Sequence, residues 1–433
     1  MSIFCQFLEM IEDLALVSSR ADKMSILQES DSPEMRSLLT LTLDSNELFF
    51  VRNLPDGLIH TQGVFPPDTE SFVGFLMDLK YNRKDSKGYL TSFLEQYDES
   101  VSKVTQVILN KELKCGVKVK TAEKALSMGL EEFRVMKGGS ITKDGEVDFS
   151  GIVFPCIAEI KYDGFRSSTI VDWDANDVTF LSTSGKPLAN CVKIAETLLS
   201  DECKKLVQDN LGTRPVVFDA ELVAKNGSFR ESQKHLSRDE DYTGDEFELV
   251  VFTVLLYDDW ITSLEEPRST ITPISSHQVS ILSAIKNAGF DFLKSVRRIK
   301  ALDQSRVQEY MQSVINAGHE GLMIKNLDQP YDRRRVKGWM KWKFEDFYDC
   351  TITGFAEGEG KHRDKLGAFI CDFNGVEVSV GGSYKKSLDD NNRTFYWENK
   401  EGYMDGVIKV IACGVTPDGS LRHPRFVEFH EEK

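Results

Sequence analysis

The sequence predicts a multidomain protein of the α+β class. Its 433 residues exceed what one hydrophobic core usually holds, roughly 250–300 residues, and its 41% hydrophobic content can fill several cores. The spacing of apolar residues also changes along the chain, from helical to mixed to strand-like. We therefore expect an all-α domain at 1–140, a mixed α/β domain at 150–346 and a small β-barrel at 347–433.

The first 135 residues are predicted to be mainly helical. Apolar residues recur every three or four positions in "FCQFLEMIEDLAL", "SFVGFLMDLK" and "TSFLEQYDESVSKVTQVILNKEL". The polar, glycine-rich stretch that follows, "MKGGSITKDGEVDFSG", is typical of a linker between domains.

The central and C-terminal regions differ in their strand patterns. Between 150 and 345, β-rich runs such as "PVVFDAELV", "ELVVFTVLLYD" and "EGLMIKN" alternate with helical runs. After Phe347 the sequence consists of short strands separated by glycines, as in "CTITGFAEGEG", "GAFICDFNGVEVSVGG" and "VIKVIACGVTPDG". This last pattern predicts a small β-barrel.

The overall charge is acidic, but two segments are basic. The net charge is −16, which on its own argues against a nucleic-acid partner. "YDRRRVKGWMKWK" (331–343), however, holds six cations and one acid, and the segment from Lys103 to Lys124 holds six lysines and two acids. Each segment is either a solvated face or an anion-binding site, because phosphate binding depends on the local field.

Several classes of protein are excluded by composition. No apolar run approaches the roughly 20 residues that span a bilayer. The N-terminal segment "MSIFCQFLEMIEDLALV" has no basic start and carries acids, so a signal peptide is not expected. The eight cysteines are scattered without a C-x-x-C pair, which argues against a structural zinc site and suits a reducing, cytoplasmic compartment.

The segment "AEIKYDGFR" (158–166) combines a lysine with carboxylates and an arginine beside an Asp-Gly turn signal. Alternation along a strand turns Glu159 and Lys161 to one face, and the turn leaves Lys161 at a strand end that a ligand can reach. A lysine becomes a nucleophile when its amine is neutral, and desolvation or nearby cations favour that form. The alternative is an ordinary hairpin with a surface lysine.

Three further segments carry charges on predicted strands. In "VVFDAELV", Asp219 and Glu221 share one face, which suits a hydroxyl or a hard cation, or is a half-exposed strand. In "HEGLMIKN", Glu320 opens a strand that is apolar on both faces and needs a partner or a metal, unless it is a turn acid. In "WMKWKFED", Lys341 and Lys343 share a face, and such paired ammonium groups favour an anion between them.

The order K-x-D-G-x-R, D-x-E, E-G-L-M-I-K and K-x-K resembles the covalent nucleotidyltransferases: ATP-dependent DNA ligases, RNA ligases and mRNA-capping enzymes. "LNKELKCGVKVKTAEKAL" (109–126) is similar to the helix pair in the DNA-binding domain of DNA ligases, and "TPDGSLRHPRFVEF" (416–429) to the closing motif of their oligonucleotide-binding (OB) barrel. The chain most resembles the compact three-domain ligases of tailed phages. The three expected domains are then a helical DNA-binding domain, an adenylation (nucleotidyltransferase) domain and an OB-fold domain.

The resemblance implies a role for each matching residue. Lys161 would attack the α-phosphate of ATP and become lysyl-AMP, and the metal, Mg²⁺ or another divalent cation, would contact Glu221 and Glu320. The remaining residues would bind the nucleotide: the adenine edge at Glu159 and Ile160, the adenine ring at Phe252, the ribose at Arg166 and Glu221, the phosphates at Arg335, Lys341 and Lys343, and pyrophosphate at Arg422 and Arg425.

The resemblance also implies partners. The substrate would be nicked double-stranded DNA, gripped through phosphates rather than base edges, and the protein would act as a monomer in a bacterial or phage-infected cell, with a sliding clamp as a candidate partner. One departure is Ser182-Thr183, where the family usually has Ser-Arg; Lys186 is a candidate substitute. Two alternatives stay open: an RNA ligase or capping-type enzyme, and a catalytically silent DNA clamp. The NAD-dependent ligases are disfavoured because their cysteine zinc module is absent.

Overall fold

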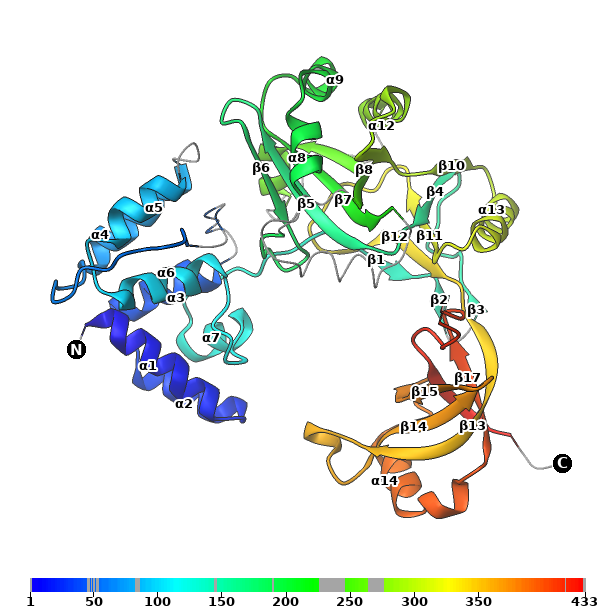
Figure 1. The fold of residues 1–433 in the computed structure, drawn as a ribbon. Coiled ribbons are helices and arrows are strands. Elements are labelled where there is room, and N and C mark those ends of the chain that lie inside the picture. Colours follow the sequence, from blue (N-terminus) through cyan, green and yellow to red (C-terminus); the bar gives the residue numbers. More distant parts are fainter. Residues whose placement is uncertain are drawn as a thin grey trace. The chain divides into compact units, whose positions relative to one another are not determined.

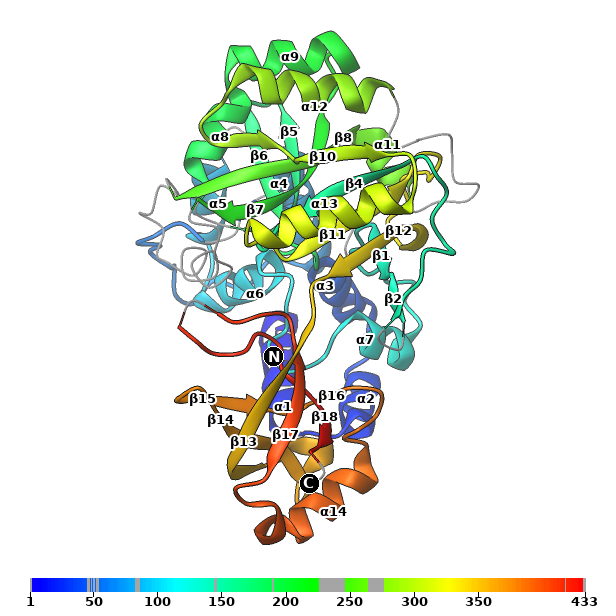
Figure 2. The same ribbon diagram turned by 90° about the vertical axis from the view of Figure 1, so that its right-hand side faces the viewer.

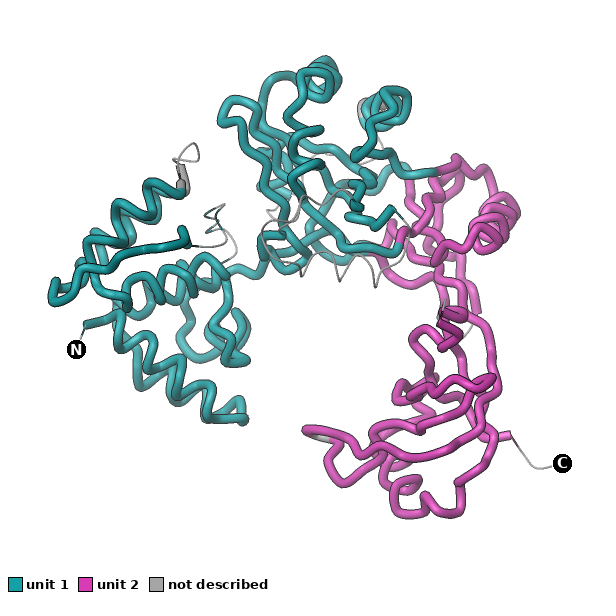
Figure 3. The backbone as a smooth tube through the Cα atoms, viewed as in Figure 1, with its two compact units in different colours: residues 1–137, 163–297, 327–336 teal, residues 138–162, 298–326, 337–433 magenta. Residues whose placement is uncertain are grey.

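The protein is described here by a computed structural model, which covers residues 2–44, 47, 49, 51, 54–81, 86–143, 146–188, 191–225, 246–263, 276–416 and 418–430. The chain forms two compact units (Figure 3). Unit 1 comprises residues 1–137, 163–297 and 327–336, and unit 2 comprises residues 138–162, 298–326 and 337–433. The central segment that the sequence predicts as one domain therefore contributes to both units.

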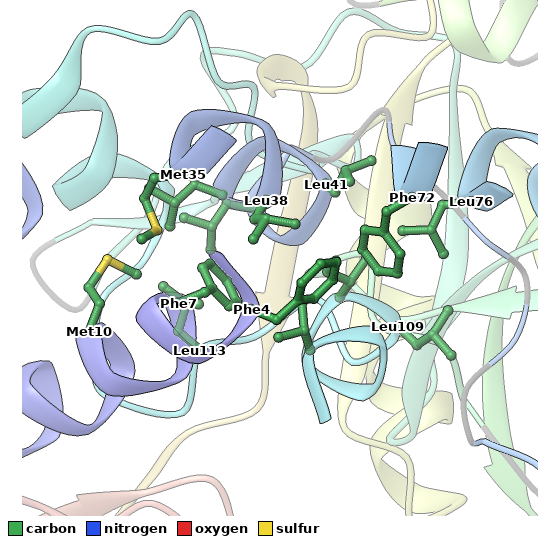
Figure 4. Close-up of a cluster of buried hydrophobic side chains, with 14 of the residues drawn as sticks. Phe4, Phe7, Met10, Met35, Leu38, Leu41, Phe72, Leu76, Leu109 and Leu113 are labelled. Atoms are coloured by element: carbon green, nitrogen blue, oxygen red, sulfur yellow. The ribbon is translucent and has the colours of Figure 1, made fainter. Parts of the chain in front are cut away.

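The N-terminal part of unit 1 is helical, as predicted (Figure 1). Its helices surround one apolar core, to which α1 contributes Phe4, Phe7 and Met10 (Figure 4). Phe4 meets Phe72 of α4 edge-on, with ring centroids 4.9 Å apart. The helices are α1 (Ile3–Leu16), α2 (Arg20–Glu29), α3 (Pro33–Leu43), α4 (Thr69–Tyr81), α5 (Ser86–Leu94), α6 (Glu99–Leu109) and α7 (Val119–Leu126).

One periodic segment of the sequence is two helices in the structure. Helix α5 ends at Leu94 and α6 begins at Glu99. The carboxylate of Asp98 accepts a hydrogen bond from the Ser100 amide at 2.8 Å and so caps α6. An aspartate at this position satisfies an amide that has no partner within the helix, which favours a new helix start over continuation.

Unit 1 also contains a five-stranded sheet in the order β6-β5-β7-β8-β9. Helices α8, α9 and α12 cover one face (Figure 2). Their apolar residues form one core with the strands. The short helix α11 (Tyr257–Thr262) follows β8 directly. The other bounds are β5 (Phe165–Asp172), β6 (Asp177–Leu181), α8 (Val192–Leu199), α9 (Asp201–Leu211), β7 (Val216–Ala224), β8 (Phe247–Leu256), α12 (Ser276–Ala288) and β9 (Leu293–Ser295).

The first sheet of unit 2 has the order β1-β12-β11-β4-β10. Helix α13 (Gln304–Asn316) packs Val307, Met311 and Val314 against it. Its strands are β1 (Lys137–Ser140), β4 (Cys156–Lys161), β10 (Arg298–Ala301), β11 (Gly321–Asn326) and β12 (Arg335–Lys343).

The glycine-rich stretch predicted as a linker is more ordered than expected. It contributes β1 to this sheet and forms a small ribbon from β2 (Thr142–Lys143) and β3 (Glu146–Val147). At Gly138 an added Cβ would lie 2.7 Å from the carbonyl oxygen of Trp339 on β12. The glycine is therefore needed for close approach of two strands, which local composition does not distinguish from a flexible linker.

The C-terminal strands of unit 2 form a six-stranded sheet in the order β15-β14-β13-β17-β18-β16. Only Gly381 separates β15 from β16, so one segment supplies both edge strands and the sheet curls around a single core. This agrees with the predicted C-terminal barrel. Its strands are β13 (Asp346–Glu357), β14 (Leu366–Phe373), β15 (Val376–Val380), β16 (Gly382–Ser383), β17 (Val407–Ala412) and β18 (Arg425–Phe429), with short 3₁₀ turns η2 (Gly360–His362) and η3 (Lys400–Tyr403).

The barrel also carries a helix that the strand pattern did not indicate, α14 (Asp390–Glu398). Asp389 caps it by accepting a hydrogen bond from the Asn392 amide at 2.8 Å. Arg393 is buried and donates to the carbonyls of Leu366, Gly367 and Gly381 at 2.7–3.0 Å. Through Arg393 the helix thus satisfies carbonyls near Gly381. There the chain passes from β15, which pairs with β14, to β16, which pairs with β18.

Candidate active site

Lys161 is the last residue of β4, a strand that pairs with β11 on one side and β10 on the other. Cys156, Ala158 and Ile160 belong to the apolar core of this sheet. Because side chains alternate along a strand, Glu159 and Lys161 lie on the opposite face. The sequence predicted this shared face.

The segment after Lys161 crosses from one sheet to another. β4 belongs to the first sheet of unit 2, and β5, which begins at Phe165, belongs to the sheet of unit 1. The two strands do not pair, so the Asp163-Gly164 step is a crossover rather than a hairpin turn. An added Cβ at Gly164 would lie 2.2 Å from the carbonyl oxygen of Leu222, which explains the glycine.

Glu320 immediately precedes β11, and the strand register brings two lysines to it. Gly321 is aligned with Lys161 on β4 and with Lys343 on β12. One Glu320 carboxylate oxygen accepts a hydrogen bond from the Lys161 ammonium, and the other lies 2.6 Å from the Lys343 Nζ. Gly321 has φ +149°, and a Cβ there would lie 2.0 Å from the Trp342 carbonyl oxygen, so the register requires glycine.

The Glu320 carboxylate is buried, and the lysines around it are not. Its side chain is 4% exposed, whereas those of Lys161 and Lys343 are 24% and 31% exposed. Burial raises the pKa of Glu320, but attraction to Lys161 and Lys343 and their hydrogen bonds outweigh burial and leave the pKa below its ordinary value. The cluster is therefore a fixed anion with two cations that remain accessible to a ligand.

Glu159 is buried beside two further cations. Lys325 forms an ion pair with its Oε2, and the Arg298 guanidinium lies 3.7 Å from its Oε1. The Lys325 ammonium also lies over the Trp339 ring, 3.9 Å from its centroid. In the described part of the chain, the buried Oε1 of Glu159 has no hydrogen-bond partner. It therefore retains the capacity to accept a hydrogen bond from a ligand.

Unit 1 contains an ionic cluster of its own, centred on Arg166 of β5. Its guanidinium donates to both oxygens of Asp219, at 2.8 and 2.6 Å, and to the carbonyl of Met136. The Tyr331 hydroxyl donates to Asp219 Oδ2. Burial lowers the pKa of Arg166, but the Asp219 charge outweighs burial and raises it, and burial raises the pKa of Tyr331 well above its usual range. Arg166 thus stays charged and Tyr331 stays protonated.

Phe252 reaches this cluster because of a β-bulge in β8. The pairing of β7 with β8 skips from Asp219 opposite Thr253 to Ala220 opposite Val251, so Phe252 lies at this register shift. The bulge leaves Phe252 half-buried within a run of core residues, with the Arg166 guanidinium 5.1 Å from its ring centroid. Such bulges re-aim side chains. Glu221 is paired across the sheet with Arg166.

The other predicted residues lie along β12 and in the barrel. Arg335 is exposed at the start of β12 and belongs to unit 1, whereas Lys341 belongs to unit 2 and is paired with Met323 of β11. In the barrel, Arg425 donates to Glu345 at 2.7 Å, with its guanidinium 5.7 Å from the Tyr384 ring centroid. Arg422 lies just before β18.

Sequence reasoning missed the residues that hold these side chains in place. Lys325 and Arg298 neutralise Glu159, and Tyr331 hydrogen-bonds Asp219 across 112 positions of sequence. One usable signal was the lysine inside the apolar run "GLMIKN", because a lysine in a buried strand needs an anionic partner. No local signal identifies Tyr331.

The residues fit ATP and a divalent cation. The open acceptor on buried Glu159 suits an amino group such as that of adenine. The described residues hold no group of three potential ligands for a metal. Mg²⁺, however, is commonly bound by one or two carboxylates together with substrate phosphates. The Glu320 carboxylate has about four lone-pair sites, of which the two lysines occupy two.

Comparison with known proteins agrees with this architecture. Residues 148–343 match the family described as ATP dependent DNA ligase domain, and residues 357–429 match DNA ligase OB-like domain. The DNA ligase of Enterobacteria phage T4 is 22% identical over 458 residues, covering 94% of this chain and 90% of that protein. The DNA ligase of Haemophilus influenzae is 23% identical over 142 residues, covering 33% of this chain and about half, 48%, of the relative.

A solved structure named Pmar-Lig_Pre has the same fold, with a TM-score of 0.60, 22% identity and coverage of 99% of both chains. Fold and domain matches together define a nucleotidyltransferase with an attached OB-like domain. The chain belongs to the ATP-dependent DNA ligase family. Within the described residues, none of the helices has the length and apolar character needed to cross a membrane.

Proposed function

We propose that this chain seals nicks in duplex DNA by joining a 3′-hydroxyl to a 5′-phosphate. The reaction would proceed in three successive nucleophilic displacements at phosphorus. In the first, the Lys161 amine attacks the α-phosphorus of ATP. A P–N bond forms, the bond to the bridging oxygen of pyrophosphate breaks, and the amine loses a proton. In the second, AMP passes to the 5′-phosphate of the nick and the amine is regenerated. In the third, the 3′-hydroxyl attacks that phosphate and AMP leaves.

The lysine cluster supports the first transfer. Attack requires a neutral amine at a fixed distance from the phosphorus, and Glu320 holds the Lys161 Nζ in place. Lys343, on the other side of Glu320, is 31% exposed and is a partner for the oxygens of a bound triphosphate. A bound Mg²⁺, with Glu320 and Glu221 as protein ligands, would supply positive charge at the phosphates.

The other predicted residues would position the nucleotide. The open acceptor of Glu159 and the Ile160 backbone would read the adenine edge, and the ring of Phe252 would stack on the base. The ion pair with Asp219 holds the Arg166 guanidinium in place, and Glu221 is paired with Arg166 across the sheet. Both side chains would bind the ribose. Cations would bind the phosphates and the departing pyrophosphate: Arg335, Lys341, Lys343, Arg422 and Arg425.

The observation that carries the proposal is the cluster of Lys161, Glu320 and Lys343 in a chain of this family. The test is incubation with ATP labelled in the α-phosphate and Mg²⁺, followed by mass spectrometry of peptides. We expect AMP on Lys161 and none in Lys161→Ala, which should still bind nicked duplex. Unmodified protein, or AMP on another residue, would contradict the mechanism.

The acceptor is tested separately. The adenylated protein is mixed with nicked DNA, nicked RNA or RNA bearing a 5′-diphosphate. We expect sealing of nicked DNA, and preference for either RNA acceptor would indicate the related ligase or capping reactions instead. Duplex binding without adenylation would indicate a silent clamp.

A further inference from the structure

The buried carboxylate of Glu159 lies between two cations that come from the strands on either side of β4. Arg298 of β10 is aligned directly with Glu159, and Lys325 lies on β11, two positions beyond the residue that is aligned with Glu159. The side chains of Glu159 and Lys325 are each 3% exposed, and that of Arg298 is 15% exposed. A carboxylate buried this deeply needs compensating charge, and these two residues supply it.

The two cations use the two carboxylate oxygens differently. Lys325 forms an ion pair with Oε2 and is itself held over the Trp339 ring, 3.9 Å from its centroid. The Arg298 guanidinium lies 3.7 Å from Oε1, which is beyond hydrogen-bond distance. Among the residues that the structure describes, none donates a hydrogen bond to this oxygen. Arg298 therefore supplies positive charge to Glu159 without occupying its open acceptor.

The charge state of such a carboxylate decides which purine it can bind. An ionised carboxylate only accepts hydrogen bonds, whereas a protonated one also donates. Adenine carries an amino group at C6, which donates, and guanine and hypoxanthine carry a carbonyl oxygen there, which accepts. A compensated carboxylate thus binds the amino group and rejects the carbonyl, because two facing acceptors are both left unsatisfied. Removing a neighbouring cation from a buried carboxylate favours its neutral form, which tolerates both.

We propose that Arg298 is a positioning residue which, through Glu159, makes the nucleotide site selective for a purine with an amino group at C6. The proposal rests on the proposed function, because it takes the site that adenylates Lys161 as the nucleotide site. Arg298 lies in "SVRRIK" (295–300), outside the four charged motifs of the sequence. Its contribution follows from the pairing of β10 with β4 and from its distance to Oε1.

The test measures transfer of a nucleotide to Lys161 from three triphosphates that differ at C6. ATP carries an amino group there, inosine triphosphate (ITP) a carbonyl oxygen, and purine riboside triphosphate only hydrogen. Adduct formation, followed by intact mass over a range of nucleotide concentrations, gives kcat/KM for each. The wild type should prefer ATP to purine riboside triphosphate by about 10- to 100-fold, the effect of one hydrogen bond to a charged group. It should use ITP less well still.

Arg298→Gln should lower the ratio of kcat/KM for ATP to that for ITP by about tenfold. The value for purine riboside triphosphate should hardly change, since that nucleotide has no group at C6 to contact. Lys325 still compensates Glu159 in this variant, so the fold should persist, as circular dichroism would show. Arg298→Lys keeps the charge and should retain the preference for ATP. An equal fall for all three nucleotides in Arg298→Gln would assign Arg298 to the fold alone and overturn the proposal.

The matched control is Lys300→Gln, at an exposed cation two positions further along β10. It should match the wild type for all three nucleotides. A loss of preference in Lys300→Gln equal to that in Arg298→Gln would overturn the proposal, because a general change of charge on this strand would then explain both.

A double variant tests whether Arg298 acts through Glu159. An amide offers a donor as well as an acceptor, so Glu159→Gln should use ITP nearly as well as ATP. Adding Arg298→Gln to this variant should change the ratio no further, because the two substitutions remove the same interaction. Additive effects of the two substitutions would contradict the proposed route through Glu159.

The wild type alone separates this inference from the proposed function. An adduct on Lys161 with equal kcat/KM for the three nucleotides would leave the proposed function intact and overturn the inference. Failure to form lysyl-AMP from ATP would contradict the proposed function itself, and the inference with it.

Discussion

The ionic clusters of the two units are built in opposite ways. In unit 2 the anion, Glu320, is buried and its lysines, Lys161 and Lys343, are partly exposed. In unit 1 Asp219 is fully buried and its partner Arg166 is only 16% exposed, and the Tyr331 hydroxyl adds a further hydrogen bond to Asp219. The first cluster leaves its cations accessible to a ligand, whereas the second is closed.

Under the proposed function, this difference separates the residues that contact the nucleotide from those that support the fold. A cation that is one-quarter to one-third exposed can exchange a carboxylate partner for a phosphate at small cost. A buried, bidentate pair cannot, because removing either partner leaves an uncompensated charge in the interior. Substitutions in the unit 2 cluster should therefore alter activity, and substitutions in the unit 1 pair should alter stability.

The largest effect on activity is expected at Lys161. Lys161→Arg keeps the positive charge beside Glu320, but a guanidinium stays protonated and is no nucleophile. Formation of the AMP adduct, followed by intact mass, should become undetectable while the urea midpoint hardly changes. The matched control is Lys343→Arg, which should retain adenylation because this position needs only a cation. Equal loss of adenylation in Lys161→Arg and Lys343→Arg would contradict the assignment of Lys161 as the nucleophile and of Lys343 as a cation only.

The largest effect on stability is expected at Asp219. Asp219→Asn leaves Arg166 buried without its anion, which should lower the free energy of unfolding by about 3–5 kcal/mol. Urea denaturation measures the change. Asp258→Asn removes the anion of an exposed pair, 3.5 Å from Arg214, and should cost about 0–1 kcal/mol. Similar urea midpoints for Asp219→Asn and Asp258→Asn would show that the Arg166–Asp219 pair stabilises the fold no more than an exposed pair does.

A smaller effect is expected at Phe252, which the bulge places beside Arg166. Phe252→Ala should raise the KM for ATP by roughly tenfold, since stacking of a base on an aromatic ring contributes about 1–3 kcal/mol. Phe252→Tyr preserves the ring and should keep the wild-type KM. An unchanged KM in the alanine variant would place the base elsewhere.

The smallest effect concerns the pH dependence of stability. The folded-state pKa of Glu320 lies below its ordinary value of 4.5, so the ionised form stabilises the fold above that pH. This contribution is lost as the pH falls through the folded-state pKa. The difference in unfolding free energy between wild type and Glu320→Gln should therefore shrink as urea titrations move from neutral to acid pH. A difference that grows toward acid pH would contradict the assignment.

Much of the site follows from local sequence patterns. Two-residue alternation predicts that Glu159 and Lys161 share a face, as do Asp219 and Glu221, and the apolar cores on the opposite faces agree with it. The prediction of a linker before β4 is wrong for β1, because glycines that permit close strand approach have the same composition as those of a flexible linker.

The sequence by itself determined which side chains share a strand face and which buried charges need partners, since these depend on the neighbouring residues alone. Only the tertiary structure decided which residues are those partners. The register at Gly321 sets Lys161 and Lys343 on either side of Glu320, and a single bulge brings Phe252 to Arg166. Register and bulges depend on packing between strands far apart in the chain, where a one-residue shift turns every side chain to the other face.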